Sequence, residues 1–394
     1  MTAAVIVAER PSRAPAGVER LPALTGYRFI LAFLVMIFHV FCAAELYKTT
    51  SMAPSNNPTV ITAPLALVAV SSFFVLSGFV LTWSTPIGAS KRAFWRRRAA
   101  KILPNHLLTW AVTIAFLALA TPRASSLGAG GLGAGKVITN LFLVQTWVPR
   151  VDYILGVNGV SWSISCEAFF YLAFPLLALA IRKLPERRLW MAFAVASALI
   201  ITAPLPTLLI SGSSAVPWLP MPVTRFWLLY AFPPVRALEL TLGIVIARLV
   251  QTEQWPRVSL AKVVVLPVVV FCCVPFLPPE YLLGAALCVP MALIIPTLAT
   301  NQRAGGPGRL GHPVMQRLGE ASFALYMVHY PVIRIIRHLL GPDRRFDWWS
   351  GTLVGVGMML VAQALALLVY QYFEAPLTRW LGARRTGLRA EPAM

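Results

Sequence analysis

The amino-acid sequence predicts an all-α polytopic membrane protein with about ten transmembrane helices and both termini in the cytoplasm. The 394 residues have a mean hydropathy of +0.72 and only 12% are charged, whereas a soluble domain carries about a quarter charged residues. The apolar residues form long unbroken runs, which predict helices rather than the alternating strands of a barrel. The basic residues gather in short clusters between these runs.

Each predicted span approaches the roughly 20 residues that a helix needs to cross the hydrocarbon layer. The spans are 24–44, 60–83, 102–120, 162–181, 189–210, 229–250, 259–278, 281–299, 319–340 and 351–373. They form one membrane domain over 21–380, between a disordered cytoplasmic tail at 1–20 and a second cytoplasmic tail at 381–394. The loop 121–161 is predicted outside, and its apolar stretch 141–147 is too short to span, so we expect it to be re-entrant or interfacial.

Lysine and arginine residues set the predicted orientation. With the N-terminus in the cytoplasm, the basic cluster from Lys91 to Lys101 and the basic loop 182–188 both fall inside, as the positive-inside rule requires. Arg334 and Arg337, near the outer end of the ninth span, run against this asymmetry. We expect a multi-pass protein of the bacterial inner membrane. The net charge of +20 does not predict nucleic-acid binding, because the basic residues form no single face or stripe.

Two ionisable residues of the first span are predicted to share a function. Arg28 and His39 are eleven residues apart, so they lie on one helix face with His39 about 16 Å deeper. Ionisable groups inside a bilayer are costly and by default mark function. A cation near the surface and an imidazole at depth suit an elongated anion with a buried reactive end, such as acyl-coenzyme A. The alternative is a structural histidine that bridges two helices.

A basic cluster at the start of the third span is a second candidate site. Arg97 or Arg98 and Lys101 are three or four residues apart and therefore share a helix face. Such a face can hold phosphates at the membrane surface. A positive-inside anchor explains the cluster equally well.

Glu167 is the only acid in a long apolar stretch, and a buried carboxylate requires a partner. Arg236 or a histidine are the candidates, and a structural ion pair is the alternative to a catalytic role. Arg236 and Glu239 are three residues apart and can instead neutralise each other.

His329 and Tyr326 are predicted to lie near mid-bilayer on one face of the ninth span, since they are about one turn apart. They either line a shared cavity with His39 and Glu167 or form a structural hydrogen bond between helices. The five cysteines match no metal-ligand spacing and no disulfide framework, and no glycine-rich nucleotide loop is present. The sequence thus predicts no metal and no permanently bound cofactor.

Seven motifs in order resemble those of acyltransferase family 3, integral-membrane enzymes that O-acylate sugars, lipopolysaccharide, peptidoglycan and secondary metabolites. They are Leu24–Arg28 with His39, Ser72–Phe79, Arg97–Pro104, Trp162–Tyr171, Arg236–Gly243, Ser322–Pro331 and Tyr372–Arg379. Three positions depart from the pattern: Thr25 replaces the usual aspartate, Lys101 an arginine and Ala168 a second acid. Lysine lacks the planar fork of arginine, which weakens the case for a bidentate phosphate contact at that position.

The resemblance implies transfer of an acyl group from acyl-coenzyme A to a hydroxyl of a sugar-containing acceptor. The segments Trp95–His106 and Ser161–Glu167 look most like actinomycete members that decorate antibiotics, so a macrolide-type metabolite or a glycan is the implied acceptor. His39 would be the general base or a transient acyl carrier, and Glu167 would orient or charge-balance the site. The remaining implied roles are coenzyme A binding by Arg28, Arg97, Arg98 and Lys101, and substrate binding by Tyr171, Arg236, Tyr326 and His329.

Two other classes of protein are compatible with a polytopic bundle. A secondary transporter or exporter would also contain buried charges and proline-broken helices, but the sequence shows no inverted repeat and no paired discontinuous helices. A membrane scaffold would leave Arg28 and His39 unexplained.

Overall fold

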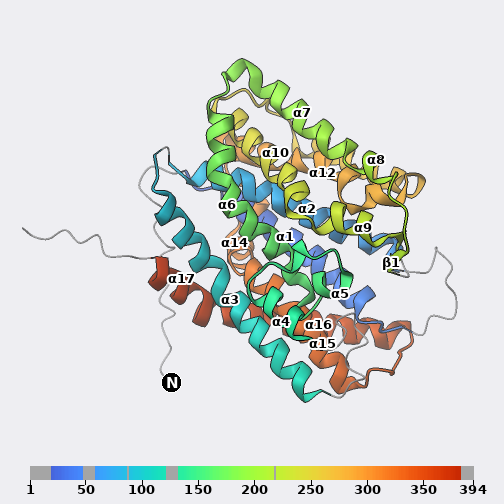
Figure 1. Cartoon of the computed structure of the whole chain (residues 1–394). Coiled ribbons are helices and arrows are strands. Elements are labelled where there is room, and N and C mark those ends of the chain that lie inside the picture. Colours follow the sequence, from blue (N-terminus) through green and yellow to red (C-terminus); the bar gives the residue numbers. More distant parts are fainter. Residues whose placement is uncertain (1–18, 48–57, 87, 121–131, 217–218, 383–394) are drawn as a thin grey trace, which may run out of the picture.

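A computed structural model describes residues 19–47, 58–86, 88–120, 132–216 and 219–382. These residues form a bundle of helices with one short antiparallel hairpin (Figure 1). Most of the two predicted tails and the first part of the predicted outer loop, 121–131, lie outside this description.

Eleven α-helices form the body of the bundle. They are α1 (Pro22–Phe38), α2 (Pro58–Ser84), α3 (Lys91–Leu119), α6 (Trp162–Arg182), α7 (Leu189–Thr202), α10 (Pro233–Gln251), α11 (Leu260–Cys273), α12 (Ala285–Ala292), α13 (Ile294–Gly305), α15 (Ser322–Leu340) and α16 (Trp348–Val369), as counted among the described residues.

Shorter elements connect or extend these helices. The α-helical ones are α4 (Ala134–Leu141), α5 (Val151–Ile154), α8 (Pro204–Thr207), α9 (Val223–Phe226), α14 (Pro313–Glu320) and α17 (Ala375–Gly382). The 3₁₀ turns are η4 (Gln145–Trp147), η5 (Gly159–Ser161), η6 (Glu186–Arg188), η8 (Val274–Phe276), η9 (Pro279–Leu283) and η10 (Arg309–Gly311). Three π-helical turns, η1 (His39–Ala43), η7 (Trp227–Ala231) and η11 (Tyr370–Glu374), and the strands β1 (Ser214–Val216) and β2 (Leu219–Pro222) complete the described chain.

The prediction of an all-α polytopic membrane protein is confirmed. Within the described ranges, eight segments are long and apolar enough to cross a membrane: Pro22–Phe41, Pro64–Ser84, Lys91–Leu119, Gly159–Arg182, Glu186–Thr207, Val223–Gln251, Ala285–Gly305 and Trp348–Gly382. Of the other two predicted spans, Leu260–Phe276 is apolar but shorter, and α15 carries two arginines and two histidines that lower its hydropathy. The count of ten and the orientation stay predictions.

Helices α1 and α2 occupy the centre of the bundle. Figure 1 shows α7, α10 and α12 on one side and α3, α15 and α16 on the other, with α1 and α2 between them. The backbones of α2 and α10 touch: a Cβ atom on Gly78 would lie 2.1 Å from the carbonyl oxygen of Leu240, and one on Gly243 would lie 1.9 Å from that of Val75. Glycine at both positions permits this contact, which is a common way for membrane helices to pack without a hydrophobic driving force.

Residues 132–161, the described part of the segment between α3 and α6, pack into the bundle on one face. Gln145 and Thr146 are fully buried, whereas Phe142 and Trp147 are exposed. Side chains satisfy much of the irregular backbone here: Ser165 Oγ donates to the Leu143 carbonyl at 2.6 Å and is hydrogen-bonded to the Thr146 hydroxyl. Non-helical backbone at membrane depth is tolerated where protein groups satisfy it in this way. The packing places the first residues of α6, Trp162 to Cys166, inside the bundle.

Candidate active site

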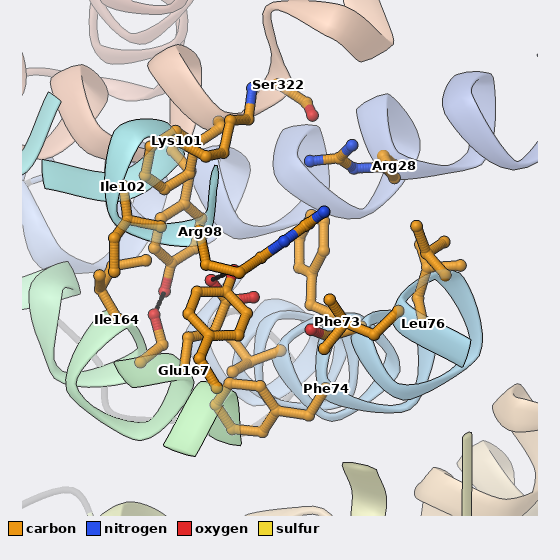
Figure 2. Close-up of a pocket in the computed structure, with 18 residues that line it drawn as sticks. Arg28, Phe73, Phe74, Leu76, Arg98, Lys101, Ile102, Ile164, Glu167 and Ser322 are labelled. Carbon is orange, nitrogen blue, oxygen red and sulfur yellow. Dashed lines mark hydrogen bonds between the residues drawn. The ribbon is translucent and has the colours of Figure 1, made fainter. Parts of the chain in front are cut away.

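A cavity that opens to solvent lies between α1, α2, α3, α6 and α15 (Figure 2), and its empty volume, solvent at the mouth included, is about 880 Å³. Aromatic and aliphatic side chains form most of its wall, including Phe73, Phe74 and Ile164. Its polar lining consists of Arg28, Ser77, Arg98, Lys101, Ser163, Glu167, Tyr171, Ser322 and Tyr326. A mostly apolar pocket with a few convergent polar groups is the usual form of a small-molecule site.

Two arginines reach into the cavity from facing helices. Figure 2 shows the guanidinium groups of Arg28 and Arg98 directed toward the same space. Among the described residues neither forms a salt bridge, and the Nε atom of Arg98 is buried without a hydrogen-bond partner. A guanidinium keeps its charge under all ordinary conditions, so the two groups can attract an anion into the cavity, which Glu167 also lines.

Arg97 and Arg98 are neighbours in the sequence but occupy different environments. Arg97 is exposed and does not line the cavity, whereas Arg98 is half-buried and does. Consecutive helical residues are about 100° apart, so only one of them can face the cavity. Of the two arginines predicted to bind phosphates on α3, the structure brings Arg98 into the site.

Glu167 faces the cavity beside these cations. The hydroxyl of Tyr171, one turn further along α6, donates to its Oε2 atom at 3.2 Å. The prediction that Glu167 pairs with Arg236 or a histidine is wrong. Arg236 pairs with Glu239 at 3.1 Å, and the membrane histidines, His39 and His329, hydrogen-bond to each other. Glu167 and Tyr171 therefore act together as an acceptor and donor pair on the cavity wall.

Arg236 belongs to the packing between α2 and α10 and is not among the residues that line the cavity. Its guanidinium donates to Ser71 Oγ and the Leu283 carbonyl, both at 3.1 Å, and lies 5.0 Å from the ring centre of Phe74. Arg236 and Glu239 are both nearly fully buried. Arg236 and Glu239 thus neutralise each other, which is one of the two alternatives that the sequence left open.

Lys101 lines the cavity, but its charge is neutralised by Glu374, which follows α16. Its ammonium group forms an ion pair with Glu374 of η11, which also accepts from Asn105 Nδ2 at 2.5 Å. Glu374 is completely buried. Thr378 Oγ1 donates to the Ala100 carbonyl nearby, so this pair fastens the C-terminal helix to α3, beside which α17 lies in Figure 1.

Replacing Lys101 with methionine should therefore destabilise the protein. We expect a loss of about 3 kcal/mol, the low end for breaking a buried ion pair, because Lys101 itself is 29% exposed. Thermal unfolding of the purified protein would show a lower Tm. The double substitution Lys101→Met with Glu374→Gln removes the uncompensated charge and should recover most of the loss. A single variant as stable as the wild type would contradict a structural role for the pair.

His39 and His329 meet one layer beyond the cavity. The Nε2 atom of His329 is 3.1 Å from Nδ1 of His39, and each Nδ1 atom is 2.9 Å from the backbone carbonyl four residues earlier, that of Leu325 or Val35. His329 is completely buried, and His39 is half-buried. His39 is also the first residue of the π-helical turn η1, and π-turns within helices are frequent at functional sites.

Tyr326 separates the histidine pair from the cavity. Its hydroxyl is 2.8 Å from the Ser163 hydroxyl, and its ring centre is 5.9 Å from that of His329. The two histidines were expected to share one cavity with Glu167. Instead, Glu167, Ser163 and Tyr326 line the cavity, and His329 and His39 follow behind Tyr326.

A buried loop supports the helix that carries His329. Pro331 has no backbone N–H, so the Met327 carbonyl loses its usual helical donor. Asn158 Nδ2 donates to this carbonyl at 3.1 Å. Its neighbour Val157 has a φ of 57°, a strained value for a β-branched residue, and its carbonyl accepts from Arg334 at 3.2 Å.

Sequence reasoning missed Asn158, Ser163 and Glu374. Ser163 and Glu374 belong to motifs that were recognised, but their partners lie more than 160 and 270 residues away, respectively, and no local pattern specifies such pairs. Pro331 within an apolar span was a usable signal that some side chain must satisfy the carbonyl four residues before it. The described residues contain no group of three or more histidine, cysteine, aspartate or glutamate side chains placed to hold a metal ion.

The fold and the site define a polytopic membrane protein with a basic, partly apolar pocket beside a buried imidazole pair. Residues 21–369 match the acyltransferase domain, which is most of the chain. The chain belongs to acyltransferase family 3, and it is an O-acyltransferase enzyme.

Three curated relatives are similar over different lengths. Acyltransferase MdmB of Streptomyces mycarofaciens is 37% identical over 94% of this chain and 95% of its own length. YrhL of Bacillus subtilis, named as a peptidoglycan O-acetyltransferase, is 22% identical over 79% of this chain and 50% of its own length. Nodulation protein 10 of Rhizobium leguminosarum is 25% identical over 32% of this chain and 36% of its own length. No solved structure matches.

Proposed function

We propose that this enzyme transfers an acyl group from acyl-coenzyme A to a hydroxyl of a sugar-containing acceptor, either a glycan or a glycosylated secondary metabolite. The observation that carries the proposal is a cavity with two guanidinium groups, Arg28 and Arg98, that form no salt bridge within the described part of the chain, with the His39–His329 pair behind its Tyr326 wall. The phosphates of coenzyme A fit the arginines. The slim pantetheine arm fits the apolar wall, and the thioester is the end that would reach the imidazoles.

The proposed reaction needs one base and no metal from this chain. His39 takes the proton from the acceptor hydroxyl, and the oxygen attacks the thioester carbonyl carbon. The carbon–sulfur bond then breaks, and the coenzyme A thiolate leaves with the proton that His39 returns. General base catalysis by a positioned histidine contributes about 10²–10⁴-fold to such a step. Glu167 with Tyr171, and Ser163 with Tyr326, supply hydrogen-bonding groups between the two arginines and the histidines.

Tyr326 must be displaced for the thioester to reach His39. Its hydroxyl is held by Ser163 and by the Val160 carbonyl at 3.3 Å, and its ring packs against Phe73 at 6.1 Å. The acyl-coenzyme A arm would take the place of this ring. A site that closes behind the substrate also excludes water, which would otherwise hydrolyse the thioester.

The experiment that tests the function uses the purified protein in lipid nanodiscs with acyl-coenzyme A donors of increasing chain length and a panel of glycosylated acceptors. Release of free coenzyme A thiol that depends on the acceptor, with an equal amount of acylated product by mass spectrometry, would support the proposal. Movement of the acceptor across sealed vesicles without any acylated product would favour the transporter instead.

The predicted orientation places the cavity mouth on the cytoplasmic side, where coenzyme A is present. Arg28 and Arg98 lie near the ends of α1 and α3 that the positive-inside rule assigns to the cytoplasm. Cysteines introduced at the exposed positions Lys91 and Gly308 of a cysteine-free variant should be protected from an impermeant reagent in intact cells. Cysteines at the exposed positions Ala134 and Asp343 should be labelled. The opposite result at any one position would contradict ten spans with both termini inside.

A further inference from the structure

We infer that His329 is a positioning residue: it accepts a hydrogen bond from Nδ1–H of His39 and so leaves the lone pair on Nε2 of His39 as the catalytic base. The inference rests on the proposed function, because it assigns the atom that takes the proton of the acceptor. It changes the predicted role of His329 from a substrate contact to a residue that acts through His39.

The tautomer of His329 follows from its backbone contact. Its Nδ1 atom is 2.9 Å from the Leu325 carbonyl oxygen, which can only accept a hydrogen bond, so Nδ1 carries the proton. In a neutral imidazole the other nitrogen is then an acceptor. The Nε2 atom of His329 is therefore the acceptor that His39 meets at 3.1 Å.

The same reasoning assigns the proton on His39. Its Nδ1 atom lies 2.9 Å from the Val35 carbonyl and 3.1 Å from the accepting nitrogen of His329. Two acceptors converge on one atom, and only a protonated Nδ1 satisfies either of them. The proton is shared between these acceptors, and the Nε2 atom of His39 keeps a free lone pair. This is the nitrogen that a general base must offer to a hydroxyl.

Packing holds the His39 ring in this arrangement. The rings of Phe38 and Tyr330 meet it edge to face, with centres at 5.2 and 5.3 Å and interplanar angles of 68° and 77°. His329 has no exposed surface, whereas His39 retains some. The accessible histidine is thus suited to meet a substrate, and the inaccessible one is suited to support it.

The supporting group is neutral, in contrast to the aspartate of a serine hydrolase triad. Among the described residues no carboxylate hydrogen-bonds to either histidine. A carboxylate at this depth would carry a large desolvation cost, while an imidazole nitrogen fixes the tautomer without a buried charge. When His39 takes up the proton on Nε2, the carbonyl dipole of Val35 and the lone pair of His329 both point at the resulting cation.

Two substitutions at position 329 separate this role from simple packing. His329→Phe keeps a ring of similar size but removes the acceptor, and we expect kcat to fall on the order of 10²-fold with little change in the KM for acyl-coenzyme A. His329→Gln places an amide oxygen near the former Nε2 position and should restore part of kcat. The matched control is His338→Phe, since His338 is on the same helix, nine residues away and beside Phe116. Its kcat should stay near that of the wild type.

Nitrogen-15 NMR of histidine-labelled wild-type protein provides a readout that does not depend on the activity of any variant. The five histidines can be assigned by single substitutions. We expect Nδ1 to be protonated and Nε2 unprotonated in both His39 and His329, the reverse of the tautomer that free histidine prefers. A protonated Nε2 on neutral His39 would overturn the inference.

The kinetic outcomes also distinguish this inference from the proposed function. Loss of turnover in His39→Ala together with wild-type kcat in His329→Phe would overturn the positioning role and leave the function intact. Equal loss in folded His329→Phe and His329→Gln would overturn it as well, because the accepting atom would not matter. Wild-type turnover in His39→Ala would instead overturn the proposed catalytic base itself.

Discussion

Replacing His39 with alanine is expected to abolish acyl transfer while the protein remains folded and still binds acyl-coenzyme A. The variant loses the Nε2 lone pair of His39, which takes the proton of the acceptor in the proposed mechanism, and only water or solvent base could replace it. The loss in kcat should reach or exceed about 10²–10⁴-fold, the contribution of a positioned general base. The measurement is the initial rate of coenzyme A release at saturating donor and acceptor.

The structure offers controls for this experiment. His39 does not line the cavity that contains Arg28 and Arg98, so donor affinity should be close to that of the wild type. Size-exclusion chromatography and thermal unfolding report on folding, and His338→Ala removes an imidazole from the same bundle at a distance from the pair. Turnover within a factor of two of the wild type in folded His39→Ala would remove His39 from the mechanism.

The second large effect is expected from Arg98. A charge-assisted hydrogen bond contributes about 1.5–3 kcal/mol, so Arg98→Gln should weaken acyl-coenzyme A binding by about 10- to 150-fold. Arg28→Gln should do the same, because both guanidinium groups reach into one cavity without an ion-pair partner among the described residues. Titration calorimetry or a fluorescent coenzyme A analogue would provide the Kd, and kcat at saturating donor should change less than the affinity.

Arg97 is the natural control for Arg98, because the sequence alone does not show which of the two faces the cavity. It carries the same charge one residue away but is exposed and outside the cavity, so Arg97→Gln should weaken binding much less than Arg98→Gln. Arg92→Gln, at an exposed position near the start of α3, controls for the loss of general surface charge. The affinity of the wild type should also decrease with rising salt, and that dependence should be smaller in Arg98→Gln. Equal effects at 97 and 98, or no effect at either, would return both residues to a role as membrane anchors.

The helical fold was predictable because it depends on local sequence patterns. Apolar runs of the right length and the spacing of the basic clusters identified each long helix that the structure describes, since lipid imposes the same demand on each span. Where the prediction was incomplete, a tertiary contact decides the local structure. The predicted span 281–299 is interrupted at Gly284, which has a φ of 123°. A Cβ atom at this position would lie only 2.5 Å from Ser71 Oγ, so the close approach requires glycine. Nothing in the neighbouring sequence specifies that contact.

In the candidate site, too, local patterns predicted part of the arrangement and tertiary contacts decide the rest. Helix geometry predicted that Arg28 and His39 share one helix face, whereas the structure places Arg28 at the cavity and His39 outside its lining, at the start of η1. It also predicted that only some of the basic residues on α3 share a face. It did not predict that Tyr326 stands between the cavity and the histidines, or that Lys101 is matched by Glu374. Glu167 was assigned the wrong partner because Arg236 and the cations of α1 and α3 were equally available in the sequence, and only the packing of α10 against α2 removes Arg236 from the choice.

The close contacts of Gly78 with Leu240 and of Gly243 with Val75 have a mechanical consequence for the enzyme. Where two backbones touch without intervening side chains, rotamer changes cannot alter their separation, so α10 braces α2, which forms one wall of the cavity. The opposite wall is formed by α3, which is buried over a smaller share of its length and is fastened to the C-terminal helix by polar contacts. If a bulky donor widens the cavity, α3 must therefore move rather than α2. The turnover rate should then depend on how readily the contact between α3 and η11 breaks.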